Sequence, residues 1–136
     1  ERRKNRNKKG IIDVGEVNNI DGDGDYINVK LGTVYGNVNI TSDYGGIQIA
    51  EMAPDAGNIN IRTDYTGIKI GYNANYHFNF EISTEYAGVS GKDEFEISIS
   101  REKSNERYYK GYYGKSNSDN NVSITSDYGG ISFTKN

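Results

Sequence analysis

Hydrophobic and polar residues alternate with a period of two in short segments of this chain, and these segments recur at a fixed distance. Four of them align without gaps and span residues 38–49, 59–70, 80–91 and 122–133. Alternation of this kind is typical of strands with one buried face. Each segment is therefore expected to form two short strands joined by a turn. The chain is rich in isoleucine and tyrosine and has a single leucine, which also favours strands over helices.

The turn carries the same residue types in all four segments. An acidic residue is followed by tyrosine, any residue and glycine, and successive acidic residues are 21, 21 and 42 positions apart, so one register is kept. A glycine that recurs at one phase indicates a positive φ or a close approach of two backbones. The three rows are Asp43, Asp64, Glu85 and Asp127; Tyr44, Tyr65, Tyr86 and Tyr128; and Gly46, Gly67, Gly88 and Gly130.

A unit of this size cannot bury its own apolar residues, whereas stacked neighbours about 4.8 Å apart share a core. The sequence therefore predicts an all-β, single-domain β-solenoid over residues 11–136 with rungs of about 21 residues, and a rolled sandwich of hairpins is the alternative. Residues 11–14 and 27–31 are interpreted as degenerate rungs, and the amino-terminal rung is expected to act as a cap. Residues 1–10 contain six basic side chains and are expected to be a tail or linker.

The rung expected at residues 101–121 has no aliphatic residue and cannot fill a core in the ordinary way. Residues 94–100 are expected to run on as a strand and to return through 107–113 as a hairpin, followed by a polar loop, so that the irregular insertion covers about 94–121. Its tyrosines and cations match the composition of binding surfaces. They form the candidate binding site: Arg107, Tyr108, Tyr109, Lys110, Tyr112 and Tyr113. The alternative is a hairpin that covers the side or end of the stack.

A turn of the form Ser/Thr-Asp/Glu-Tyr-x-Gly-Ile/Val occurs at 42–47, 63–68, 84–89 and 126–131, and a Tyr-Tyr-Lys-Gly-Tyr-Tyr-Gly run at 108–114 precedes the last of them. In these features residues 11–136 resemble bacterial adhesin-like proteins of the auto-transporter-adhesin-like or toast-rack type, known chiefly as domains of unknown function. The resemblance implies an exported β-solenoid at the periplasm or cell surface. It implies no catalytic residues.

The tyrosine and acidic rows each allow two interpretations. Packing at a corner is favoured for the tyrosines, since a binding site rarely needs every rung, and a sugar-stacking strip is the alternative. The carboxylates are expected to accept backbone N–H groups in turns. Carboxylates about 5 Å apart would also suit a retaining glycosidase or a divalent cation. No histidine or arginine repeats beside them.

A second candidate cation site lies in the run Asp21-Gly-Asp23-Gly-Asp25. Alternating oxygen ligands suit Ca²⁺, but Tyr26 and Gly32 stand where an EF-hand needs glycine and glutamate. A flexible turn is the favoured interpretation and a loose Ca²⁺ site the alternative. No other cofactor is expected.

Charge and hydropathy limit the classes of partner that the chain is expected to bind. Residues 11–136 carry 10 basic and 18 acidic side chains, which argues against nucleic acid as a partner. No apolar run approaches the roughly 18 residues of a membrane span. The chain begins at Glu1 without Met, which is typical of a processed or truncated piece, so a signal segment would lie outside it.

Three hypotheses follow. The favoured one is a non-catalytic, envelope-associated adhesion or scaffold module that presents a rigid β surface to a glycan or protein partner. The second is a polysaccharide-active β-helix enzyme that uses Asp43, Asp64 or Glu85. The third is a cytoplasmic regulatory or polymer-forming module, since oligomerisation through open solenoid ends is compatible with the repeat.

Overall fold

The computed structural model describes residues 2–5 and 9–136, and these residues form strands and no helix. The all-β prediction is therefore confirmed for this part of the chain. The twelve strands are β1 (Arg2–Asn5), β2 (Lys9–Val17), β3 (Asn19–Val34), β4 (Val38–Met52), β5 (Ile59–Asp64), β6 (Thr66–Tyr72), β7 (Phe78–Glu85), β8 (Val89–Ser90), β9 (Glu96–Lys103), β10 (Glu106–Tyr113), β11 (Asn121–Asp127) and β12 (Ile131–Lys135).

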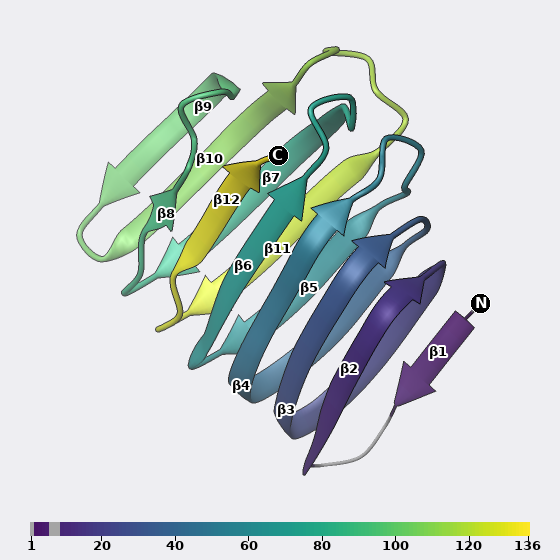
Figure 1. Cartoon of the computed structure of the whole chain (residues 1–136). Coiled ribbons are helices and arrows are strands. Elements are labelled where there is room, and N and C mark those ends of the chain that lie inside the picture. Colours follow the sequence, from purple (N-terminus) through teal and green to yellow (C-terminus); the bar gives the residue numbers. More distant parts are fainter. Residues whose placement is uncertain (1, 6–8) are drawn as a thin grey trace.

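All twelve strands belong to one sheet, which bends in the middle of β3 and β4. Residues 38–42 of β4 pair with β5, whereas residues from Gly45 on pair with β6. Beyond β4 the sheet therefore continues as two layers, which Figure 1 shows one behind the other. The first layer runs β5-β11-β7-β10-β9 and the second runs β6-β12-β8.

The parallel registers explain why the repeat produces a core. Val38 pairs with Ile59, and Ile47 pairs with Ile68, so apolar residues of one strand lie beside apolar residues of the next. The step from β4 to β5 therefore equals the spacing of the turn motif. Towards the amino terminus the step along the chain is shorter, because Ile20 pairs with Val38 and Ile12 pairs with Val29.

The strand order in space departs from the order in sequence. β11 lies between β5 and β7, and β12 lies between β6 and β8. Figure 1 accordingly shows the carboxyl-terminal strand inside the stack of strands and not at its end. The stack of strands therefore does not follow chain order. Residues 121–135 instead fill the space between the strands of residues 59–72 and those of residues 78–90.

The inward side chains form one hydrophobic cluster between the layers. It is aliphatic along most of its length and aromatic at the end that β7, β10 and the loop before β9 close. There Phe95 lies 4.9 Å from Phe80 and 5.6 Å from Phe78, measured between ring centroids. Phe95 is 8 % exposed, so the aromatic group seals this end of the core.

The hairpin prediction for the irregular segment is confirmed. β9 and β10 pair antiparallel, and β10 pairs antiparallel with β7 as well. The hairpin thus extends the first layer by two strands, and β9 is its edge.

Two expectations near the amino terminus differ from the structure. The Asp21–Asp25 run is part of β3 and is not a turn: Ile20 and Gly22 point into the core, while Asp23 and Asp25 are exposed. Within the expected tail, residues 2–5 form β1 and pair with β3, and residues 1 and 6–8 lie outside the described part.

Candidate functional site

A stack of five tyrosine rings follows the bend between the layers. Tyr26 joins the four tyrosines of the turn motif, and neighbouring rings are nearly parallel. The centroid distances are 5.0 Å for Tyr26–Tyr44, 5.3 Å for Tyr44–Tyr65, 4.8 Å for Tyr65–Tyr128 and 4.7 Å for Tyr128–Tyr86.

Each ring of the stack is about half exposed, between 42 % for Tyr44 and 52 % for Tyr65. For Tyr44, Tyr65 and Tyr128 the exposed parts are edges, because each of these inner rings has a neighbour against both faces. A sugar that stacks on an aromatic ring needs a free face. The stack therefore favours packing at the bend, and it presents a row of edges to a ligand. Burial, followed by the nearby Tyr86 and Tyr65, raises the pKa of Tyr128 above its ordinary value.

The glycine row does not serve the backbone role that its recurrence predicts. In three of the four turns the positive φ belongs to the tyrosine, at 51° for Tyr65, 57° for Tyr86 and 60° for Tyr128, and in the first turn it belongs to Gly45, at 130°, which is not a member of the row. At Gly67 and Gly88 an added Cβ would meet nothing within 4 Å. These glycines face outward, so that prediction is wrong. Because glycine has no side chain, the row leaves the backbone of the second layer uncovered on its outer surface.

A groove of about 640 Å³ lies over this open surface. Gly46, Gly67 and Gly130 line it, and the next outward positions along the strands supply Lys30, Gln48 and Lys69. Gln48 is the register partner of Lys30 on one side and of Lys69 on the other, so the two lysines are two strand spacings, about 9.6 Å, apart. Exposed Ile11 lines the groove at β2. The groove therefore combines a flat floor with a row of polar side chains at one strand spacing. The row is Asp13, Lys30, Gln48 and Lys69, and Asp13 pairs in register with Lys30.

The acidic row lies just before the bend on the outer surface of the first layer. Asp127 pairs in register with Asp64 on one side and with Glu85 on the other. Asp43, Asp64 and Glu85 are exposed. Hydrogen bonds within the turns come from hydroxyls instead, such as Ser126 Oγ, which donates to the carbonyl oxygen of Gly129 at 2.6 Å.

The hairpin residues predicted as one binding site are divided between two faces of β10. Tyr109 is 4 % exposed, and Lys92 Nζ lies 4.5 Å from its ring centroid. Tyr113 packs 5.0 Å from Tyr72 between ring centroids, and its hydroxyl donates to the carbonyl oxygen of Ala74. Both rings therefore contribute to closing the core.

The outward side of β10 holds Tyr108, Lys110 and Tyr112, whereas Arg107 lies at an inward position. The hydroxyl of Tyr108 donates to Glu81 Oε2 at 2.5 Å, a bond that raises the pKa of Tyr108. Arg101 lies over the same ring. Lys110 and Tyr112 line a separate hollow of about 690 Å³ over β7, β10 and β11. These residues are the part of the predicted site that remains open to a partner.

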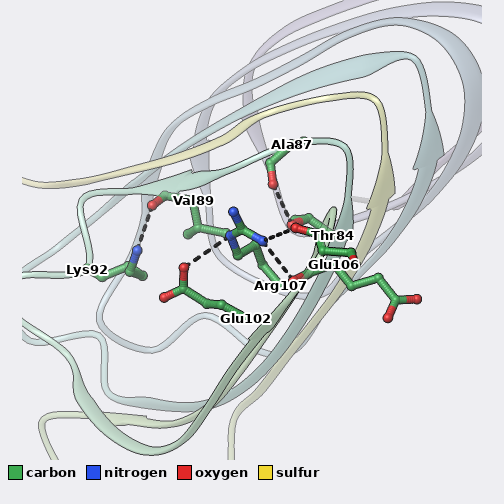
Figure 2. Close-up of polar contacts among 8 residues, drawn as sticks. Thr84, Ala87, Val89, Lys92, Glu102, Glu106 and Arg107 are labelled. Carbon is green, nitrogen blue, oxygen red and sulfur yellow. Dashed lines mark hydrogen bonds and ion pairs between the residues drawn. The ribbon is translucent and has the colours of Figure 1, made fainter.

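Arg107 already has partners within the hairpin. Figure 2 shows its guanidinium beside Glu102, with Nε 3.2 Å from Oε1, and its Nη1 donates to the carbonyl oxygen of Glu106 at 3.0 Å. The figure also shows Thr84 Oγ1 donating to the carbonyl oxygen of Ala87 at 2.8 Å, in the turn that follows β7. Arg107 therefore fixes the tight turn between β9 and β10.

The proposed cation ligands Asp21, Asp23 and Asp25 lie along one strand. Alternate residues of a strand are about 6.8 Å apart, whereas Ca²⁺ ligands lie about 2.3–2.6 Å from the ion. Among the residues that the structure describes, no group of three acidic or histidine side chains is placed to hold a metal ion.

Sequence reasoning missed an asparagine row at the opposite end of the strands from the tyrosines. Asn19 Oδ1 accepts the backbone N–H of Asn37, Asn37 Oδ1 accepts that of Asn58, and Asn58 Oδ1 accepts that of Asn121, at 2.7, 2.7 and 2.8 Å. The signal was present, since asparagine recurs at 37, 58, 79 and 121 in the phase of the turn motif. The row holds the entry of neighbouring strands in register.

Comparison with protein-family models, with curated proteins and with solved structures found no match. Among the described residues, no helix is long and apolar enough to cross a membrane.

Proposed function

We propose that this protein is a non-catalytic binding module of the β-solenoid kind. Support for the solenoid comes from the parallel registers, in which Val122 pairs with Ile59 and with Phe80, the residues at the same phase of the repeat. The shorter steps near the amino terminus, from Ile12 to Val29 and from Ile20 to Val38, would then be compressed rungs. The adhesin-like resemblance of the turn motif supports an exported protein at the cell envelope.

The observation that carries the proposal is the groove on the second layer. Its glycine floor admits a ligand close to the backbone, and its polar groups repeat along the stacking direction. A repeating array suits an extended ligand better than a compact substrate, since one kind of contact can be made at successive strands. The ligand is therefore a glycan or a protein segment that lies across the strands, with an anionic group beside Lys69, whose in-register neighbours are Gln48 and Ser132, whereas Lys30 already has Asp13 beside it.

The test is a binding array of glycans and cell-wall polymers, with and without Ca²⁺, on the full chain and two variants. Gly67→Tyr fills the groove, and the free space above Gly67 lets the fold accept it. Asn60→Tyr is the matched control, because Asn60 is exposed on the outer surface of the first layer. Circular dichroism checks that both variants fold.

Binding that Gly67→Tyr abolishes and Asn60→Tyr retains would support the groove. Equal binding by the native chain and Gly67→Tyr would refute it. Binding that is lost only in a third variant, Tyr112→Ser, measured on the same array, would move the site to the hairpin. If the native chain bound no polymer of the array, the hypothesis that the ligand is a glycan would be refuted.

One observation favours the alternative of a polysaccharide-active enzyme. Where the hairpin meets the acidic row, a hollow of about 460 Å³ is lined by Glu85, Glu106 and Asp127 together with Arg101 and Arg107. Carboxylates on neighbouring strands are the groups that glycoside hydrolysis uses. Release of reducing sugar from a polymer in the same array, lost in Glu85→Gln, would establish this function and refute the non-catalytic proposal.

A further inference from the structure

The segment of residues 121–136, here called the closing segment, occupies a slot whose walls adjoin each other in sequence. One wall is β5 and β6, the other is β7 and β8, and only residues 73–77 separate them along the chain. The closing segment reaches the slot after the whole β9–β10 hairpin and a loop. The slot is thus built by one part of the chain and filled by a distant part.

Contacts of the closing segment are made on both sides. β11 pairs over its length with β5 and with β7, and β12 pairs with β6 and with β8. Val122, Ile124 and Ile131 are each at most 2 % exposed. The Tyr128 ring lies between those of Tyr65 and Tyr86. Without this segment, the facing edges of the four strands β5, β6, β7 and β8 and a strip of core would be open.

The slot recognises features that repeat along the chain. Residues 122–131 differ from residues 38–47 at a single position, where Ser123 stands in place of Asn39. At the entry, the backbone N–H of Asn121 donates to Asn58 Oδ1, as other members of the asparagine row do. The closing segment of a second copy would make every one of these contacts.

The loop before the closing segment suits a hinge. Residues 114–120 are Gly-Lys-Ser-Asn-Ser-Asp-Asn, and most of them are exposed. Seven extended residues span up to about 25 Å. The loop is held by few side-chain bonds, among them Asn79 Nδ2 to the carbonyl oxygen of Ser118 and Asn120 Nδ2 to that of His77.

We propose that the slot is an interaction site for a second copy of this chain, which inserts its own closing segment and receives one in return. Reciprocal exchange of an identical element keeps all strand pairing and core packing, so only the hinge and the protein concentration decide between monomer and dimer. The partner is specified by the slot itself, which takes a parallel strand pair with this alternation and these turn residues. This inference is independent of the groove on the second layer.

Disulfide trapping in the full chain tests the exchange, and the sequence has no cysteine of its own. Asn60 and Ser123 are exposed and pair in register across β5 and β11. In-register neighbours lie about 4.8 Å apart, within the range of about 4.4–6.8 Å that a disulfide accepts. Two single variants, Asn60→Cys and Ser123→Cys, are unfolded together, refolded at high concentration and oxidised.

A covalent dimer linked through positions 60 and 123, identified by mass spectrometry, is the expected result. The control mixture pairs Ser123→Cys with Asn39→Cys, which lies one strand further away in the same row and is equally exposed. Equal dimer yields in both mixtures would show random thiol collision and overturn the proposal. So would a mixture without dimer when the double variant Asn60→Cys/Ser123→Cys closes its disulfide within one chain.

Discussion

Replacement of Thr63 by valine should stabilise this protein. Thr63 belongs to a row of inward hydroxyls beside the bend, together with Ser42, Ser126 and Thr84, and all four side chains are buried. Ser42, Thr84 and Ser126 each donate a hydrogen bond to a carbonyl oxygen of their own turn. Thr63 Oγ1 is buried with no hydrogen-bond partner in the described structure, and in this turn it is Thr66 Oγ1 that donates to a backbone carbonyl, that of Asp64.

The size of the effect follows from the burial of that hydroxyl. A buried hydroxyl without a hydrogen bond destabilises a protein by about 1–3 kcal/mol relative to a satisfied or apolar group. Valine has nearly the shape of threonine and replaces the hydroxyl with a methyl group. Thr63→Val should therefore raise the free energy of unfolding by about 1–2 kcal/mol, which corresponds to a rise in Tm of roughly 3–8 °C for a chain of this size.

Urea unfolding followed by circular dichroism measures the change, and an unaltered m-value shows that the folded state is as compact as before. Ser126→Ala is the matched control, because its hydroxyl donates to the carbonyl oxygen of Gly129 at 2.6 Å. That variant should lose about 1–2 kcal/mol. A neutral or destabilising Thr63→Val, beside a destabilising Ser126→Ala, would refute the reasoning that the Thr63 hydroxyl lacks a partner.

Two further predictions concern the asparagine row and the aromatic end of the core. Asn37→Ala removes the acceptor of the Asn58 N–H and should lower the free energy of unfolding by about 1 kcal/mol. Asn39→Ala, at an exposed outward position, should leave that free energy unchanged. Equal urea midpoints for the two variants would contradict a stabilising role of the Asn37 side chain. Burial raises the pKa of Tyr72 to about 12, against about 10 in the unfolded chain. The unfolded state therefore loses the phenolic proton of Tyr72 at a lower pH than the folded state, so the free energy of unfolding should fall as the pH rises from about 10 to about 12. The urea midpoint of Tyr72→Phe should fall less than that of the native chain over this range. An identical fall in both proteins would exclude Tyr72 as a cause.

Local alternation is what made the strands predictable. In residues 59–70 the pattern of inward isoleucines and outward polar residues is complete, and β5 and β6 cover almost the same range. The composition of the Asp21–Asp25 run predicts a turn, because aspartate and glycine are typical of turns. In the structure Gly22 is buried on the core side of β3 and pairs in register with Ile40 of β4, so the glycine does not interrupt the strand.

Spatial order and site geometry depend on facts that the local pattern does not contain. The phase of the repeat allows Val122 to pair with either Ile59 or Phe80, and it pairs with both. Likewise, the composition of the hairpin indicated a binding surface, but alternation along β10 sends Tyr109 and Tyr113 inward and Tyr108 and Tyr112 outward. The groove was missed because the glycine row was interpreted as a backbone constraint and not as open surface.

The place of the closing segment also constrains how the chain reaches its native state. When residues 78–90 become available, the edge of β5 and β6 is unpaired, and the repeat allows Phe80 to align directly with Ile59. Such pairing would be compact and in phase, yet it would leave residues 121–136 without a place. A chain that folds from its amino terminus must therefore delay the last step of strand stacking or undo a premature one. Slow refolding phases and transient misfolded states are the expected kinetic signature of this topology.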